Sequence, residues 1–148
     1  MDENLASVLA DVSRLMRRAF DARARGIGVT RPQWRVLSVL HRFEGIKQGQ
    51  LADLIEVEPI TVCRMVDRLQ EAELVERRAD PADRRSWRLF LTPRGRALLA
   101  ELMPLADSML EEALDGVGAE DRAGLRAGLE RIRQNLSRRP AEDLLSHG

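Results

Sequence analysis

Two groups of residues in this chain have the types and the spacing needed to bind the phosphates and base edges of a nucleic acid. One is the adjacent pair Arg84 and Arg85, which follows the turn-forming residues 80–83, Asp-Pro-Ala-Asp. The members of the other lie three and four residues apart, on one face of a helix: Thr61, Arg64 and Arg68. An arginine can donate two hydrogen bonds to O6 and N7 of guanine, and arginines on a stiff hairpin tip can enter a narrow minor groove. Recognition of duplex DNA is therefore the first chemistry that these residues suggest.

Each of these side chains also has an ordinary surface role. The two tip arginines could form a solvated hairpin end, and Thr61 could be a surface hydroxyl. Arg68 could pair with either of two acids close to it in the sequence, Asp67 and Glu71. The sequence leaves these alternatives open.

Charge is unevenly distributed along a chain whose formal net charge is zero. From Arg77 to Arg96, seven arginines stand against two acids, Asp80 and Asp83, a local balance of +5. From residue 97 to residue 130, eight acids stand against two arginines, a balance of −6. The first segment is a candidate footprint for a phosphate backbone, and the second would repel one. Within the basic segment, Asp83 is interpreted as an acceptor that holds a neighbouring guanidinium in position.

Apolar residues at three- and four-residue spacing predict the helices that must position these side chains. Thr30 and Gln33 form a predicted capping box, and Pro59 and Pro93 suit first helical turns. In the short third helix, the side chains of Leu51, Leu54 and Ile55 are expected to face inward. The last helix carries a heptad-like seam of apolar residues: Leu125, Leu129, Ile132 and Leu136. The predicted helices span residues 5–25, 31–45, 48–55, 59–72 and 93–114, followed by the helix with this seam.

Between residues 75 and 91 the apolar period changes from 3.6 to 2, which predicts a β-hairpin with a charged tip. A short helix, a break at 56–58 and an amphipathic helix form the order of a helix-turn-helix. We therefore expect a mainly α protein with a small β-hairpin wing (α+β), a winged helix-turn-helix with dimerisation helices at both ends. Because a long helix pair would expose its leucine seam in a monomer, the seam is interpreted as core and dimer contact together.

Two stretches of the predicted hairpin form a recognisable signature: residues 75–85, Val-Glu-Arg-Arg-Ala-Asp-Pro-Ala-Asp-Arg-Arg, and residues 89–95, Leu-Phe-Leu-Thr-Pro-Arg-Gly. They are similar to the wing of the MarR family, the multiple-antibiotic-resistance regulators, and the sequence resembles in particular the SlyA branch of that family. Further similarity lies in residues 34–40, 50–52 and 67–69 and in Arg64, and the order of elements matches over about 5–137. The chain departs from the usual pattern at residues 56–58, Glu-Val-Glu, where helix-turn-helix proteins often have glycine.

The resemblance implies a homodimer whose first, fifth and sixth helices form the dimer body and which binds a palindromic operator as a transcription regulator, for example a repressor. It also implies control by small aromatic or phenolic ligands lodged between the dimer body and the winged domains. The side chains available for such a ligand are an aromatic wall and three cationic groups: Trp34, Arg14, Arg17 and His41. The alternatives are core packing for Trp34 and surface or interface positions for the others.

The residues that most enzymes and metal sites need are scarce. The chain has two histidines, His41 and His147, one cysteine, no tyrosine and no glycine-rich phosphate loop, so we expect no catalytic or metal site and no cofactor. Redox-sensing members of the family carry their reactive cysteine near the N-terminus, so Cys63 is expected to be an inert thiol. A winged-helix module that binds a protein partner and no DNA is the alternative function.

The whole chain, 1–148, is predicted to form one domain. The winged helix-turn-helix covers about 30–96, and the dimerisation helices cover about 5–25 and 93–137. An acidic start and the absence of an apolar run of membrane length predict neither a signal peptide nor a transmembrane helix. A single cysteine is compatible with a reducing compartment, and we expect a cytoplasmic protein.

Overall fold

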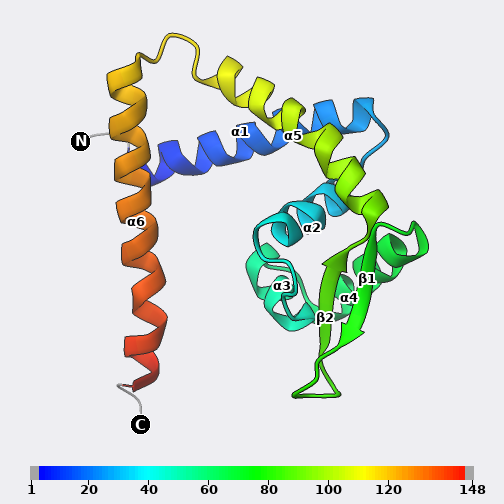
Figure 1. Cartoon of the computed structure of the whole chain (residues 1–148). Helices are drawn as coiled ribbons and strands as arrows, with labels where there is room; N and C mark the ends of the chain where they lie inside the picture. The colour runs from blue at the N-terminus through cyan, green and yellow to red at the C-terminus, as the bar shows by residue number, and fades with distance from the viewer. Residues whose placement is uncertain (1–3, 146–148) are drawn as a thin grey trace. The chain divides into compact units, whose positions relative to one another are not determined.

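The computed structural model describes the backbone of residues 4–145 and the side chains of residues 4–137 (Figure 1). In chain order the elements are α1 (Leu5–Gly26), α2 (Arg31–Arg42), α3 (Gln48–Ile55), α4 (Pro59–Glu71), β1 (Val75–Ala79), β2 (Trp87–Leu91), α5 (Pro93–Ala113) and α6 (Ala119–Leu145). The predicted class, helical with one antiparallel hairpin, is confirmed. The chain divides into two compact units, Met1–Leu110 and Glu111–Gly148.

Local capping accounts for where α2 begins. The hydroxyl Oγ1 of Thr30 accepts a hydrogen bond from the N–H of Gln33 at 3.4 Å. In return, the N–H of Thr30 donates to Oε1 of Gln33 at 2.9 Å, so the predicted capping box is confirmed. The helix ends at Arg42, shortly before Gly45, whose φ of +85° is a conformation that glycine adopts without strain.

The core of the first unit is built mainly from α2, α3, α4 and the hairpin. Its fully buried side chains include Val36, Leu37, Leu40, Leu51, Val62, Val66, Leu69, Val75 and Leu89. The prediction for α3 was wrong at one position, because Leu54 is 54% exposed. Leu51 and Ile55 lie one turn apart and both are buried, whereas Leu54 falls outside the narrow strip of this eight-residue helix that meets the core.

The hairpin is fastened to the helices along its β2 edge. Strand register pairs Val75 with Leu91 and Arg77 with Leu89, so these four side chains share one face. On the outer edge of β2, the N–H of Gly45 donates to the carbonyl of Leu89 at 2.8 Å, and the N–H of Leu89 donates to the carbonyl of Ile46 at 3.0 Å. The segment before α3 therefore acts as a short third strand, and the hairpin tip extends beyond α3 and α4 (Figure 1).

The start of α5 explains the sequence Thr-Pro-Arg-Gly at residues 92–95. Thr92 Oγ1 accepts a hydrogen bond from the N–H of Gly95 at 3.0 Å and donates one to the carbonyl of Glu73 at 2.5 Å. A Cβ atom on Gly95 would collide with the carbonyl oxygen of Leu74, so only glycine fits this close approach. α5 then continues through Pro104.

The second unit contains the end of α5, a turn and α6. Arg122 donates from Nε to the carbonyl of Val117 at 2.8 Å and from Nη2 to the carbonyl of Leu114 at 3.0 Å, which closes the turn. α6 extends to Leu145, beyond the predicted boundary at 137. Leu125, Leu129 and Leu136 of the predicted seam are exposed in the single chain. None of the helices in the described range is both long and apolar enough to span a membrane.

Candidate nucleic-acid interface

The turn before α4 is closed by a residue in a left-handed conformation. Glu56 has a φ of +54°, and its N–H donates to the carbonyls of Ala52 and Asp53. The next N–H, of Val57, also donates to the carbonyl of Ala52, at 3.1 Å. The position that often holds glycine thus keeps its left-handed geometry here with glutamate, at some cost in strain. Pro59 then begins α4, where its missing N–H removes no helical hydrogen bond.

α4 has one buried and one exposed face. Val62, Val66 and Leu69 are buried, whereas the predicted site residues Thr61, Arg64 and Arg68 are all exposed. Among the residues that the structure describes, no carboxylate forms an ion pair with Arg64 or Arg68. The alternative partner Asp67 is engaged by Arg77 of β1. These guanidinium groups are therefore available to an external anion.

Arg77 of β1 holds the hairpin against the helix-turn-helix. Its guanidinium donates from Nη1 to Oδ1 of Asp67 at 2.6 Å and to Oε1 of Gln70 at 3.0 Å. Nη2 donates to the carbonyl of Cys63 at 3.0 Å, and Nε donates to Oε1 of Gln48 at 3.0 Å. The Arg77 side chain is only 13% exposed, so these bonds join β1 to α4 and α3 in a largely desolvated position. Sequence reasoning counted this arginine with the DNA footprint and missed its structural role.

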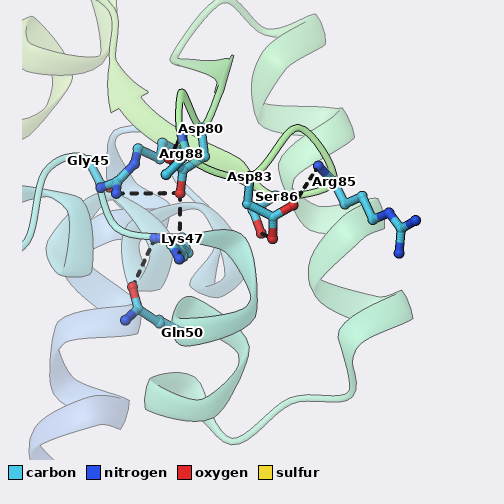
Figure 2. Close-up of polar contacts among 9 residues, drawn as sticks. Gly45, Lys47, Gln50, Asp80, Asp83, Arg85, Ser86 and Arg88 are labelled. Atoms are coloured by element: carbon cyan, nitrogen blue, oxygen red, sulfur yellow. Dashed lines mark hydrogen bonds and ion pairs between the residues drawn. The ribbon is translucent and has the colours of Figure 1, made fainter.

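The base of the wing is organised around the buried carboxylate of Asp80, which is 2% exposed (Figure 2). One oxygen accepts the N–H of Ala82 at 3.0 Å, and the other lies 3.5 Å from Lys47 Nζ and 3.4 Å from Arg88 Nη2. Arg88 also donates to the carbonyl of Gly45 at 3.1 Å. The backbone hydrogen bond from Ala82 lowers the pKa of Asp80, and the positive charges of Arg88 and Lys47 lower it further. Desolvation acts in the opposite direction, but the pKa stays below its usual value.

At the wing tip, Asp83 orders the backbone rather than a guanidinium. Its carboxylate accepts the N–H of Arg85 at 3.0 Å and the hydroxyl of Ser86 at 3.0 Å. The sequence predicted that Asp83 holds a neighbouring guanidinium. In the structure its carboxylate instead forms an Asx-type turn, in which it accepts a hydrogen bond from the N–H two residues further along the chain. Figure 2 shows the Arg85 side chain extending away from this turn. Arg84 and Arg85 are both exposed.

Ion pairing separates the seven arginines of the basic segment 77–96 into two sets. Five of them have a carboxylate partner: Arg77 with Asp67, Arg78 with Glu76, Arg88 with Asp80, Arg94 with Glu73, and Arg96 with Glu44. Within the described part of the chain, Arg84 and Arg85 have none. The positive charge that remains available to a phosphate backbone is therefore concentrated at the wing tip.

A cavity of about 330 Å³ lies in the first unit and contains two of the four predicted ligand residues. It is lined by Ser13, Met16, Arg17 and Phe20 of α1, Trp34 and Ser38 of α2, and Ala106 and Met109 of α5. Arg17 and Trp34 are thus brought together. Arg14 does not line the cavity and pairs with Asp11 at 3.5 Å, and His41 is exposed on α2 away from it.

The indole of Trp34 is fixed from two sides. Its ring meets Phe20 edge to face, with centroids 4.8 Å apart and planes at 88°. Its Nε1–H donates to Oδ1 of Asp21 at 2.6 Å, and the same carboxylate pairs with Arg31. Although burial opposes ionisation, the hydrogen bonds from Arg31 and Trp34 hold the pKa of Asp21 below its usual value. Trp34 is half-buried, so it both packs against the core and lines the cavity.

The described residues contain no group of three or more histidine, cysteine, aspartate or glutamate side chains arranged to hold a metal ion. Cys63 is half-buried, and its Sγ lies 3.8 Å from Arg77 Nη2.

Comparison with known proteins agrees with this geometry. The model of the MarR family matches residues 29–87. A transcriptional regulator named PA3341 is 33% identical, with a TM-score of 0.79 over 92% of this chain and 100% of that chain. A crystal structure of MarR is 26% identical, with a TM-score of 0.84 over 95% of this chain and 96% of that chain. A MarR family protein of Mycobacterium tuberculosis, RV2887, was solved with salicylic acid. It is 26% identical, with a TM-score of 0.73 over 88% of this chain and 97% of that chain. The chain has the winged helix-turn-helix fold and belongs to the MarR family of transcriptional regulators.

Proposed function

We propose that this protein is a transcription regulator that binds palindromic operator DNA as a homodimer. Each subunit would place α4 in a major groove and the wing over the flanking minor groove. The observation that carries the proposal is the selective pairing of arginines. Among the described residues, Arg84 and Arg85 lack carboxylate partners, and they stand on a wing that Asp80 and Arg77 brace. Thr61, Arg64 and Arg68 would supply the contacts of the helix.

Exposed apolar stripes support the homodimer. On α1, residues at steps of three, four and three are exposed: Leu5, Val8, Val12 and Leu15. On α6, Leu125, Leu129 and Leu136 form a second exposed row. Apolar surface of this extent is buried in a partner rather than left in water. A two-fold dimer requires half-sites about 10–10.5 bp apart, or a multiple of that.

The cavity beside Trp34 supports control by a small aromatic carboxylate. Arg17 offers the one cationic group among the described residues of its lining, and Trp34 and Phe20 offer aromatic surface. The Mycobacterium tuberculosis relative was solved with salicylic acid, a ligand of this chemical class. We also propose that residues 1–148 act as one functional unit and that the protein is a cytoplasmic repressor of the SlyA branch, a binding protein rather than an enzyme.

The test is a titration with duplexes selected from a random library, at two salt concentrations. Binding through several phosphates must weaken steeply as salt rises. The double variant Arg84→Ala/Arg85→Ala is expected to lower affinity and to flatten the salt dependence. Arg94→Ala is the matched control, because Arg94 is an exposed arginine that already pairs with Glu73, at 3.6 Å. Equal losses in the two variants would contradict a specific role for the wing tip.

The alternative, a winged-helix module that binds a protein partner and no DNA, is permitted by the zero net charge. It predicts that no duplex binds even at low salt. The same titration therefore decides between the two functions.

A further inference from the structure

A large apolar side chain stands on the outward face of α4 with no role in the core. Ile60, at the second position of the helix, is 65% exposed. At 100° per residue, the buried residues Val62, Val66 and Leu69 point to one side of the helix. Ile60 and Arg64, one turn apart, lie near the middle of the opposite side. Ile60 therefore lies on the same side of α4 as Arg64, the arginine that is proposed to contact base edges.

The charges on this outward face differ between its two halves. The N-terminal half carries Ile60, Thr61 and Arg64, and the C-terminal half carries Arg68 together with two acids, Asp67 and Glu71. Asp67 is engaged by Arg77, whereas Glu71 has no ion pair among the described residues. An unpaired carboxylate opposes entry between two phosphate backbones. The N-terminal half is therefore the part that reaches base edges, as is usual for recognition helices.

In the major groove, the apolar group that a base pair presents is the C5-methyl of thymine, because the other groups are hydrogen-bond donors and acceptors. A branched aliphatic side chain would desolvate those polar edges without replacing their hydrogen bonds, which is unfavourable. Against a methyl group it buries apolar surface instead. We propose that Ile60 packs on the C5-methyl of one thymine in each half-site and so determines specificity at that position.

This inference rests on the DNA-binding function proposed above and adds to it one residue that determines sequence specificity. Four residues of α-helix rise about 6 Å, and successive base pairs are about 3.4 Å apart. The thymine read by Ile60 therefore lies one or two base pairs from the guanine read by Arg64.

The first experiment is selection of binding sites from randomised duplexes by four forms of the full chain. The wild type is expected to select a thymine within two base pairs of a guanine in each half-site. Ile60→Val keeps a branched aliphatic group and is expected to retain this preference, whereas Ile60→Ser is expected to lose it at that base pair alone. Ile27→Ser is the matched control, since Ile27 is also exposed but lies between α1 and α2. It is expected to select the wild-type site.

The second experiment replaces that thymine by deoxyuridine, which keeps every hydrogen-bonding group and lacks the methyl. The wild type is expected to bind the uridine duplex about three- to fivefold more weakly, the scale of one buried methyl group. Ile60→Ser is expected to bind the two duplexes equally. Equal binding of both duplexes by the wild type, or an unchanged selected site for Ile60→Ser, overturns the assignment while DNA binding stands. A chain that selects no duplex overturns the assignment together with the proposed function.

Discussion

Arg77 on the wing donates a hydrogen bond from Nη1 to Oδ1 of Asp67 on α4 at 2.6 Å, although the two residues are ten positions apart in the sequence. The same guanidinium donates to the carbonyl of Cys63, two turns before the end of the helix. A winged helix-turn-helix must present its helix and its wing to two neighbouring grooves at once. A planar donor that touches both elements is therefore suited to fix their relative position.

Arg77→Ala is expected to lower the free energy of unfolding by about 1–3 kcal/mol, because acceptors in a partly buried position lose their donors. Arg77→Lys is expected to recover only part of this, since an ammonium group cannot reproduce the planar fork. Urea unfolding of both variants measures the effect. Arg94→Ala serves as control: its pair with Glu73, at 3.6 Å, is exposed and is expected to contribute under about 1 kcal/mol. A loss for Arg94→Ala as large as that for Arg77→Ala would contradict the assignment.

Short-range patterns in the sequence were sufficient to predict most of the fold. The capping box of Thr30 and Gln33 involves side chains three residues apart, and α3 was predicted with the bounds that the structure has. The role of Arg77 could not be predicted in this way, because its partner Gln48 lies twenty-nine residues away. In the sequence, Arg77 and Arg84 are both arginines of one basic segment. Tertiary contacts alone distinguish the arginine that holds the fold together from the one left available.

The same limit applies to the wing tip and to the cavity. Asp83 was recognised as an acceptor, but its partner is the N–H of Arg85 and not a guanidinium, because the shape of the turn decides which donor is in reach. Of the charged residues suggested for a ligand, Arg17 lines the cavity and Arg14 does not. These two arginines are three residues apart on α1, and the sequence carries no signal that separates them.

Asp83→Ala is expected to weaken operator binding severalfold although it removes a negative charge. Without the carboxylate, the N–H of Arg85 and the hydroxyl of Ser86 lose their acceptor, so the turn that presents the tip arginines becomes less ordered. Anisotropy titration of a labelled selected duplex at fixed salt measures this. Asp83→Asn, which keeps one acceptor oxygen, is expected to bind more tightly than Asp83→Ala. Tighter binding by Asp83→Ala than by the wild type would show that charge outweighs turn geometry.

Asp21 makes stability dependent on pH in the acid range. Its pKa is held below the ordinary value of 3.8. The ionised carboxylate therefore stabilises the folded state at pH values above this, and the stabilisation is lost as the pH falls through the folded-state pKa. Asp21→Asn is expected to be less stable than the wild type at about pH 7, and the difference is expected to shrink toward about pH 3. Thermal unfolding at both pH values tests this, and a difference independent of pH would exclude the ionised form as its cause.

Binding of salicylate to the cavity is expected to change the fluorescence of Trp34 and to depend on Arg17. The variant Trp87→Phe leaves Trp34 as the one tryptophan and provides the background for the measurement. In it, Arg17→Ala is expected to weaken salicylate binding about tenfold or more, because an ionic hydrogen bond of about 1.5–3 kcal/mol is lost. Arg14→Ala removes the same charge from the same helix outside the cavity lining and is expected to bind salicylate as before. If the two alanine variants lost affinity equally, the effect would come from the net charge of α1 and not from a contact inside the cavity.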